Sequence, residues 1–236
     1  MIKLFSKGVE KVKALNRASL KWIAIITMVV DHMGIFLARN GMSLQGYYIM
    51  RGIGRLSFPI FAFLLVEGFV HTKDYKKYIA RILAFAIISE PIYDLFIHKS
   101  LFYGGFCVMF NFAISLVGLY FWKKAEHGNL REKILPGVLI VLLAGIAWVL
   151  DVEYSWKCVL ITILFYTLRY NVGVRNVMVA CVLLADSSLV GMCGVLALVP
   201  ITFYNGKPGK FPKWLGYVFY PLHFVILVIL GGVVNV

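Results

Sequence analysis

The chain has 236 residues, of which 61% are hydrophobic and only 15% are charged, and its formal net charge is +13. About a quarter of the residues in an average soluble domain are charged, so this composition excludes an ordinary soluble protein and predicts an all-α, polytopic membrane bundle. In such a protein an excess of Lys and Arg first indicates cytoplasmic loops, and we expect no nucleic-acid partner.

The chain begins with a basic segment, residues 1–19, followed by an apolar run at 20–37. The start resembles the basic region of a signal peptide, but the run is too long and has no small-residue cleavage site, so we expect an uncleaved first span. The run contains Asp31 and His32. Ionisable groups at this depth cost at least a few kcal/mol unless they face other helices or a wet cavity, so the pair predicts a functional site.

Lys21 precedes His32 by eleven residues. On a helix this spacing returns to within about 20° of the same face after a rise of about 16 Å, so one face presents a cation near one membrane surface and an imidazole deep in the bilayer. Lys21 is either an interfacial anchor or a cation for an anionic ligand. Asp31 is rotated by about 100° from His32, so we expect any carboxylate partner of His32 to come from another helix.

Apolar runs and their breaks predict about nine spans. We place them at about 20–38, 50–70, 79–98, 104–122, 134–150, 155–168, 176–187, 189–203 and 215–234. With a cytoplasmic N-terminus, most Lys and Arg residues fall on the inner side, as the positive-inside rule requires of a protein in the bacterial cytoplasmic membrane. The inner segments are the chain up to Lys21, then His71–Arg81, Lys123–Lys133, Arg169–Arg175 and Lys207–Lys213.

Acidic residues gather on the opposite side of this topology, among them Glu90, Asp94 and Asp151. Arg51 and Arg55 join them at the outer start of the second span, spaced so that both lie on one helix face. We therefore expect a cluster of mixed charge around His32. The arginines either neutralise these carboxylates or bind a carboxylate or carbonyl of a substrate.

Two prolines interrupt predicted spans, Pro59 in the second and Pro91 in the third. Each removes a helical hydrogen bond, so each predicts a kink.

The sequence TyrAsnGlyLysProGly at 204–209 predicts an ordered cytoplasmic loop, and its cationic run extends through Lys210 to Lys213. Such a loop could hold phosphates through its lysine side chains and free amides, or simply be a positive-inside loop. The candidate donor-binding residues there are Tyr204, Asn205, Lys207 and Lys210. His223 in the last span is a second histidine at membrane depth and a further candidate donor-binding residue.

Several blocks of the chain resemble the TraX family, named for the membrane protein that acetylates the pilin N-terminus in conjugative systems. The blocks are LKWIAIITMVVDHMG at 20–34, RGIGRLSFPIFAFLLVEGFVHT at 51–72, YIARILAFAIISEPIYDLF at 78–96, the Asn111 region, residues 204–209 and TyrProLeuHis at 220–223. Lys21 and His32 also look like the Arg/Lys-x10-His signature of the wider membrane acyltransferase group.

The resemblance implies that His32 is catalytic and that Lys21 lies near the acyl-CoA side. It further implies that the blocks carrying Arg51, Arg55, Glu90 and Asp94 line the site. Our hypothesis is that His32 deprotonates the acceptor, oriented by Asp94, Asp151 or another carboxylate. Arg51, Arg55 or Asn111 would then stabilise the tetrahedral oxyanion. A route through an acetyl-histidine stays open.

The sequence thus predicts a basic N-terminal segment, residues 1–19, and a transmembrane acyltransferase domain, residues 20–236. The expected donor is cytoplasmic acetyl-CoA, and the expected acceptor is an extracytoplasmic amine or hydroxyl of a pilin-like peptide or a glycan. Membrane lipids are expected as the surrounding partner. Two hypotheses compete with this one: a proton-coupled transporter, and a non-enzymatic assembly factor for surface appendages.

Overall fold

The structure is a computed structural model that describes residues 14–212 and 214–234. Within these residues all regular structure is helical, with two isolated β-bridges, so the all-α prediction is confirmed. The helices are α2 (Arg17–Arg39), α3 (Leu44–Gly54), α4 (Ser57–His71), α5 (Tyr75–His98), α6 (Val108–Lys124), α7 (Leu130–Val149), α8 (Ser155–Thr167), α9 (Val172–Leu184), α10 (Leu189–Met192), the short 3-10 helix η1 (Cys193–Ala197), α11 (Leu198–Thr202) and α12 (Leu215–Val234). Most of the predicted basic N-terminal segment, residues 1–13, and Lys213 lie outside the described residues.

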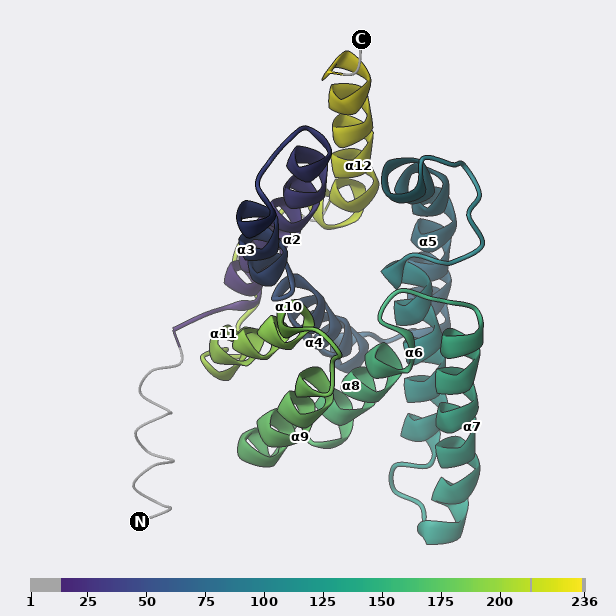
Figure 1. The fold of residues 1–236 in the computed structure, drawn as a ribbon. Helices are drawn as coiled ribbons and strands as arrows, with labels where there is room; N and C mark the ends of the chain where they lie inside the picture. The colour runs from purple at the N-terminus through teal and green to yellow at the C-terminus, as the bar shows by residue number, and fades with distance from the viewer. Residues whose placement is uncertain (1–13, 213, 235–236) are drawn as a thin grey trace. The chain divides into compact units, whose positions relative to one another are not determined.

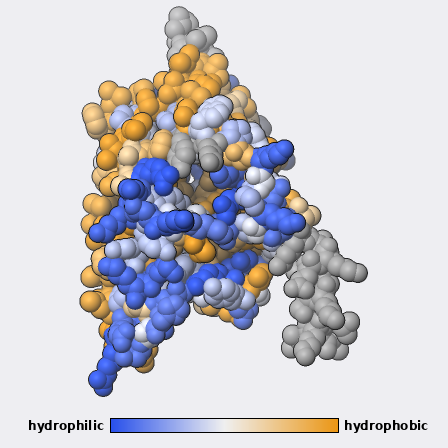
Figure 2. Space-filling model, turned by 180° about the vertical axis from the view of Figure 1, so that it is seen from behind, coloured by the Kyte–Doolittle hydropathy of each residue, from blue (hydrophilic) through white to orange (hydrophobic). Residues whose placement is uncertain are grey.

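Several described helices are apolar enough for a multi-pass membrane protein. Three stretches are long and apolar enough to cross a membrane by length and composition: Arg17–Arg39, Leu44–His71 and Leu130–Val149. Four shorter apolar helices cover Ser155–Thr167, Val172–Leu184, Leu189–Thr202 and Val218–Gly231. Hydrophobic side chains form broad stretches of the surface visible in Figure 2. The number of crossings, nine, stays a prediction.

The second predicted span is two helices rather than one. It begins at Leu44 instead of residue 50, and α3 ends at Gly54 before α4 starts at Ser57. Pro59 is the third residue of α4 and lies in its first turn. Backbone N–H groups there have no intrahelical acceptor, so the N–H that proline lacks costs the helix no hydrogen bond. The predicted kink within a continuous helix at Pro59 is therefore wrong, because the helix is already interrupted just before it. Pro91 does lie inside the continuous helix α5.

The described residues form two compact units, and the first contains those within 14–64 and 171–216. In this unit α2 and α3 lie side by side (Figure 1). Glycines let the two helices approach closely: a Cβ on Gly34 would lie 2.9 Å from the Cβ of Met50, and a Cβ on Gly54 would overlap the Asp31 side chain. This contact brings the start of the second predicted span against the middle of the first.

The second unit contains residues 65–170 and 217–236. Here α6 packs against α5, α7 and α8 (Figure 1). A buried cluster joins α7 to α8 through Ala147, Val152 and Val159, with partly buried apolar side chains of α6 and α7 packed on it. One face of α7 is thereby used for helix packing.

At one end of this unit, the loop after α6 is tied to the end of α8 by an ion-pair network. Tyr166 Oη donates to Glu126 Oε2 at 2.8 Å, Lys123 Nζ lies 3.4 Å from the same oxygen, and Arg169 pairs with Glu126 Oε1. Burial alone raises the pKa of Glu126, but the hydrogen bonds from Arg169 and Tyr166 and the nearby positive charges outweigh it and lower that pKa to about 2. Glu126 is therefore ionised at neutral pH and neutralises part of this basic end.

Candidate active site

The first turn of α2 is capped by the loop that follows α11. Asn16 caps the helix by accepting from the Ser19 backbone N–H at 2.9 Å, and the carbonyl oxygens of Lys207 and Pro208 accept from the Arg17 and Ala18 N–H groups at 2.8 and 3.1 Å. These bonds satisfy N–H groups that every helix start leaves without an intrahelical partner. The TyrAsnGlyLysProGly sequence is thus a cap for the helix that carries Lys21 and His32.

Glycine is required in this loop for two reasons. Gly206 and Gly209 have φ angles of +77° and +65°, in the left-handed region that disfavours side chains. A Cβ on Gly209 would also overlap the Asn16 side chain that caps α2. The backbone of the loop can therefore reach the helix start only with glycine at this position.

Two backbone amides of the loop, which sequence analysis proposed for phosphate binding, already have acceptors in the protein. The Asn205 N–H donates to the Leu15 carbonyl oxygen at 2.8 Å, and the Lys207 N–H donates to the Asn205 side chain at 2.9 Å. The N–H groups of Asn205 and Lys207 are therefore not free to bind phosphate, whereas phosphate binding by the lysine side chains stays a prediction. Tyr204 packs edge-on against Phe63, with ring centroids 5.3 Å apart, and the Lys207 and Lys210 side chains are exposed.

Lys21 lies against an aromatic side chain from the same loop. Its Nζ is 4.6 Å from the centroid of the Phe211 ring, which also contacts Trp22 edge-to-face at 5.3 Å. A cation over an aromatic face is held by the ring quadrupole. Sequence analysis did not single out Phe211, although an aromatic residue next to a lysine run is a recognisable signal for such a contact.

Asp31 and His32 are buried on α2, with 7% and 8% of their surfaces exposed. Asp31 Oδ2 accepts from Arg51 Nη1 at 2.5 Å, and Asp31 Oδ1 lies 3.7 Å from Arg55 Nη2. The arginines come from the end of α3, where Arg51 lies in the last turn and Arg55 is the C-cap. One carboxylate is therefore bound by two guanidinium groups from one helix end.

His32 belongs to the same cluster. Its Nε2 is 4.0 Å from Asp31 Oδ2, at the long limit of an ion pair. Asp31 therefore approaches His32 although the two residues are about 100° apart around the helix, and the expected carboxylate partner from another helix stays a prediction. Within this unit, Arg51 and Arg55 both pair with Asp31.

The other predicted catalytic residues belong to the second unit, where each holds a loop. Glu90 accepts from the Cys107 N–H at 3.0 Å, and Asp94 accepts from the Tyr103 N–H at 2.9 Å. Asn111 donates from its amide nitrogen to the carbonyl oxygens of Glu153 and Ser155, at 2.8 and 2.9 Å. Asp151 is exposed, with a φ of 48°, and its carbonyl oxygen accepts from the Phe106 N–H.

Asn111 has no amide proton left for an oxyanion in this arrangement, because each of the two has a backbone acceptor. His223 is buried on α12 and is surrounded by aromatic side chains. Its Nδ1 donates to the Phe219 carbonyl oxygen at 3.0 Å, and its ring stacks on that of Phe219. The second unit therefore holds its predicted site residues in local structural contacts.

The model of one protein family, described as TraX protein, matches residues 16–231 of this chain. This match spans almost all of the described helices, both units included. The chain belongs to the TraX family.

Two curated proteins are similar to this TraX-family chain along most of its length. The probable fimbrial assembly protein FimC, serogroup H1, of Dichelobacter nodosus is 30% identical over 88% of this chain and 92% of its own length. An uncharacterized protein of Rickettsia prowazekii (strain Madrid E) is 25% identical over 79% of this chain and 68% of its own length. No solved structure matches the chain.

Proposed function

We propose that this TraX-family protein is an integral membrane acetyltransferase that moves an acetyl group from cytoplasmic acetyl-CoA to an extracytoplasmic amine or hydroxyl. The observation that carries the proposal is the buried His32 beside Asp31, Arg51 and Arg55 on an apolar helix. A membrane protein keeps such charges at this depth at a cost, which favours a functional role. Membership of a family named for an acetylating protein supports the same reading.

His32 acts as the general base in this proposal. Its neutral imidazole takes the proton of the acceptor amine or hydroxyl while that nitrogen or oxygen attacks the thioester carbonyl. The tetrahedral intermediate carries an oxyanion, for which Arg51 and Arg55 supply positive charge. Collapse breaks the carbon–sulfur bond, and the imidazolium returns the proton to the CoA thiolate. A two-step variant, in which the acetyl group first rests on His32, uses the same residues.

Lys21 and the capping loop form the donor end of the proposed site. Lys21 is eleven residues before His32 on α2, about 16 Å along the axis. The exposed Lys207 and Lys210 belong to the loop that caps this helix end. Three cations near the start of α2 and an imidazole about 16 Å along it suit a donor with a phosphorylated head and a thioester tail.

The deciding experiment uses purified protein in proteoliposomes with labelled acetyl-CoA, an added acceptor and a pH probe. We expect CoA release that needs both donor and acceptor and that is lost in His32→Ala. His223→Ala is the matched control, because His223 is also buried at membrane depth but lies in the second unit. Transfer should rise with pH, since only neutral imidazole accepts a proton. Donor-free proton flux that His32→Ala abolishes would establish the transporter instead.

A non-enzymatic assembly role is the second candidate, and one observation favours it. The Dichelobacter nodosus relative is named a probable fimbrial assembly protein. If this chain only assembles appendages, His32→Ala should leave surface appendages intact and no acceptor should carry label. Loss of both label and function in His32→Ala would favour the enzyme.

A further inference from the structure

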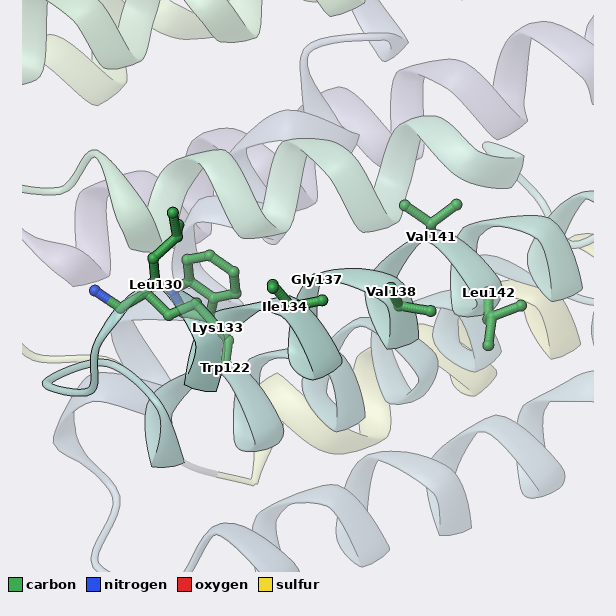
Figure 3. Close-up of a pocket in the computed structure, with 8 residues that line it drawn as sticks. All are labelled: Trp122, Leu130, Lys133, Ile134, Gly137, Val138, Val141 and Leu142. Atoms are coloured by element: carbon green, nitrogen blue, oxygen red, sulfur yellow. The ribbon is translucent and has the colours of Figure 1, made fainter.

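The outward face of α7 carries an apolar groove that the proposed acetyl transfer does not use. One wall is formed by Gly137 and six side chains along one face of α7, from Leu130 to Leu142, and the other by Trp122 of α6, around a volume of about 520 Å³. Figure 3 shows Lys133 and Trp122 toward one end of the groove and Val141 and Leu142 toward the other. The groove therefore has a polar end and an apolar body.

Gly137 forms the floor of the groove. No atom lies within 4 Å of a Cβ built at this position, so the missing side chain leaves open space between the flanking apolar side chains. The opposite face of α7 is used differently: Pro136 and Ala147 are buried, and Ile140 packs on the core cluster. The hollow thus lies on the face of α7 that the second unit leaves uncovered.

Charge at the polar end indicates what occupies the groove. Among the described residues Lys133 forms no ion pair, and Arg131, Lys123 and Lys124 lie at the same end of the α6–α7 pair. Two carboxylates in the described part of the chain lie at this end, Glu126, which is bound by Arg169, and Glu132 in the first turn of α7, so the basic residues outnumber the acidic ones. An occupant must therefore combine an apolar chain with an anionic head.

The length of the groove fits one membrane leaflet. From Leu130 to Leu142 is twelve residues, or about 18 Å of helix, and half of a hydrocarbon core is about 15 Å. The α7 stretch is also a candidate membrane span. We infer that this groove binds an acyl chain of an anionic membrane phospholipid, whose phosphate lies on Lys133 beside Trp122, at the predicted cytoplasmic surface.

The test measures lipid binding by the purified full-length protein in detergent, with phosphatidylglycerol and phosphatidylcholine of identical acyl chains, by native mass spectrometry. We expect phosphatidylglycerol to bind more tightly. Lys133→Gln should weaken phosphatidylglycerol about fivefold, the effect of one lysine on an anionic lipid, and leave phosphatidylcholine unchanged. Lys73→Gln, in a different basic loop, is the matched charge control.

A second pair of variants tests the groove itself. Gly137→Phe fills the hollow and should abolish the binding of phosphatidylglycerol. Gly145→Phe on the same helix, where a Cβ also meets no atom within 4 Å but which does not line the groove, should not. Equal binding of the two lipids, or equal effects of the two phenylalanine variants, would overturn the inference. So would disulfide cross-linking between copies in Gly137→Cys, because a second chain would then occupy the face.

Discussion

Gly54 leaves no room for a side chain beside the Asp31 carboxylate. A Cβ at Gly54 would overlap Asp31, whereas at Gly52, two residues earlier on α3, the nearest atom is Cys193 Sγ at 3.4 Å. Gly54→Ala must therefore displace the carboxylate that Arg51 and Arg55 bind, at a cost typical of overpacking, about 1–3 kcal/mol. Replacing glycine by alanine in a helix returns about 0.5–1 kcal/mol, so the net effect is destabilising at Gly54 and stabilising at Gly52.

Thermal unfolding of the purified chain in detergent, followed by tryptophan fluorescence, measures this difference. A chain of this size changes its Tm by about 2–4 °C for each kcal/mol. We expect Gly54→Ala to unfold at lower temperature than the wild type and to lose acetyl transfer, and Gly52→Ala to keep both. If the two variants have the same Tm, Gly54 of α3 does not contact the Asp31 carboxylate closely. The packing that positions Asp31 between Arg51 and Arg55 is then not the one given above.

Three further predictions concern Lys21, the basic loops and Glu126. Lys21→Ala should raise the KM for acetyl-CoA with little change in kcat, and Lys21→Arg should raise it less. If both variants have the KM of the wild type, Lys21 is an interfacial anchor and does not bind the donor. Cysteines introduced at positions 73, 124 and 207 should resist an impermeant thiol reagent added outside intact cells, and labelling at any of them contradicts the topology. Because the pKa of Glu126 is lowered from 4.5 to about 2, its stabilising contribution is complete above pH 4.5 and is lost as the pH falls to about 2. The Tm of Glu126→Gln should therefore be lower at neutral pH and change less than that of the wild type across this window.

Helix positions were predictable from the sequence because apolar run length constrains them directly. The first span was expected at 20–38 and the third at 79–98, and the helices cover Arg17–Arg39 and Tyr75–His98. The break between α3 and α4 was not predicted, because an apolar run continues on both sides of it and the charged and small residues around it, Arg51, Gly54 and Arg55, are also compatible with a continuous span. Pro59 signalled an irregularity nearby, but a proline in the first turn of a helix and one that kinks a helix look the same in sequence.

The candidate site was predictable only in part. The spacing of Lys21 and His32 is a property of one helix, so the sequence alone defines it. The grouping of Asp31 with Arg51 and Arg55 depends on how closely α2 and α3 approach, which Gly34 and Gly54 determine. The approach of Asp31 to His32 was not predicted, because a helical wheel shows only the direction in which each side chain leaves the backbone. The ends of two neighbouring side chains can still come within 4.0 Å of each other.

The charges around Asp31 bear on the choice between an enzyme and a proton relay. Two arginines face one carboxylate, so these three side chains together carry a net positive charge beside His32. A relay that passes protons through His32 forms an imidazolium next to that charge with no new negative charge beside it, and like charges at this distance in a buried site repel strongly. General-base acyl transfer also forms the imidazolium, but it forms together with a negative oxyanion, which the same arginines stabilise and which offsets the added positive charge. The excess of positive charge therefore favours acyl transfer over proton transport as the role of this cluster.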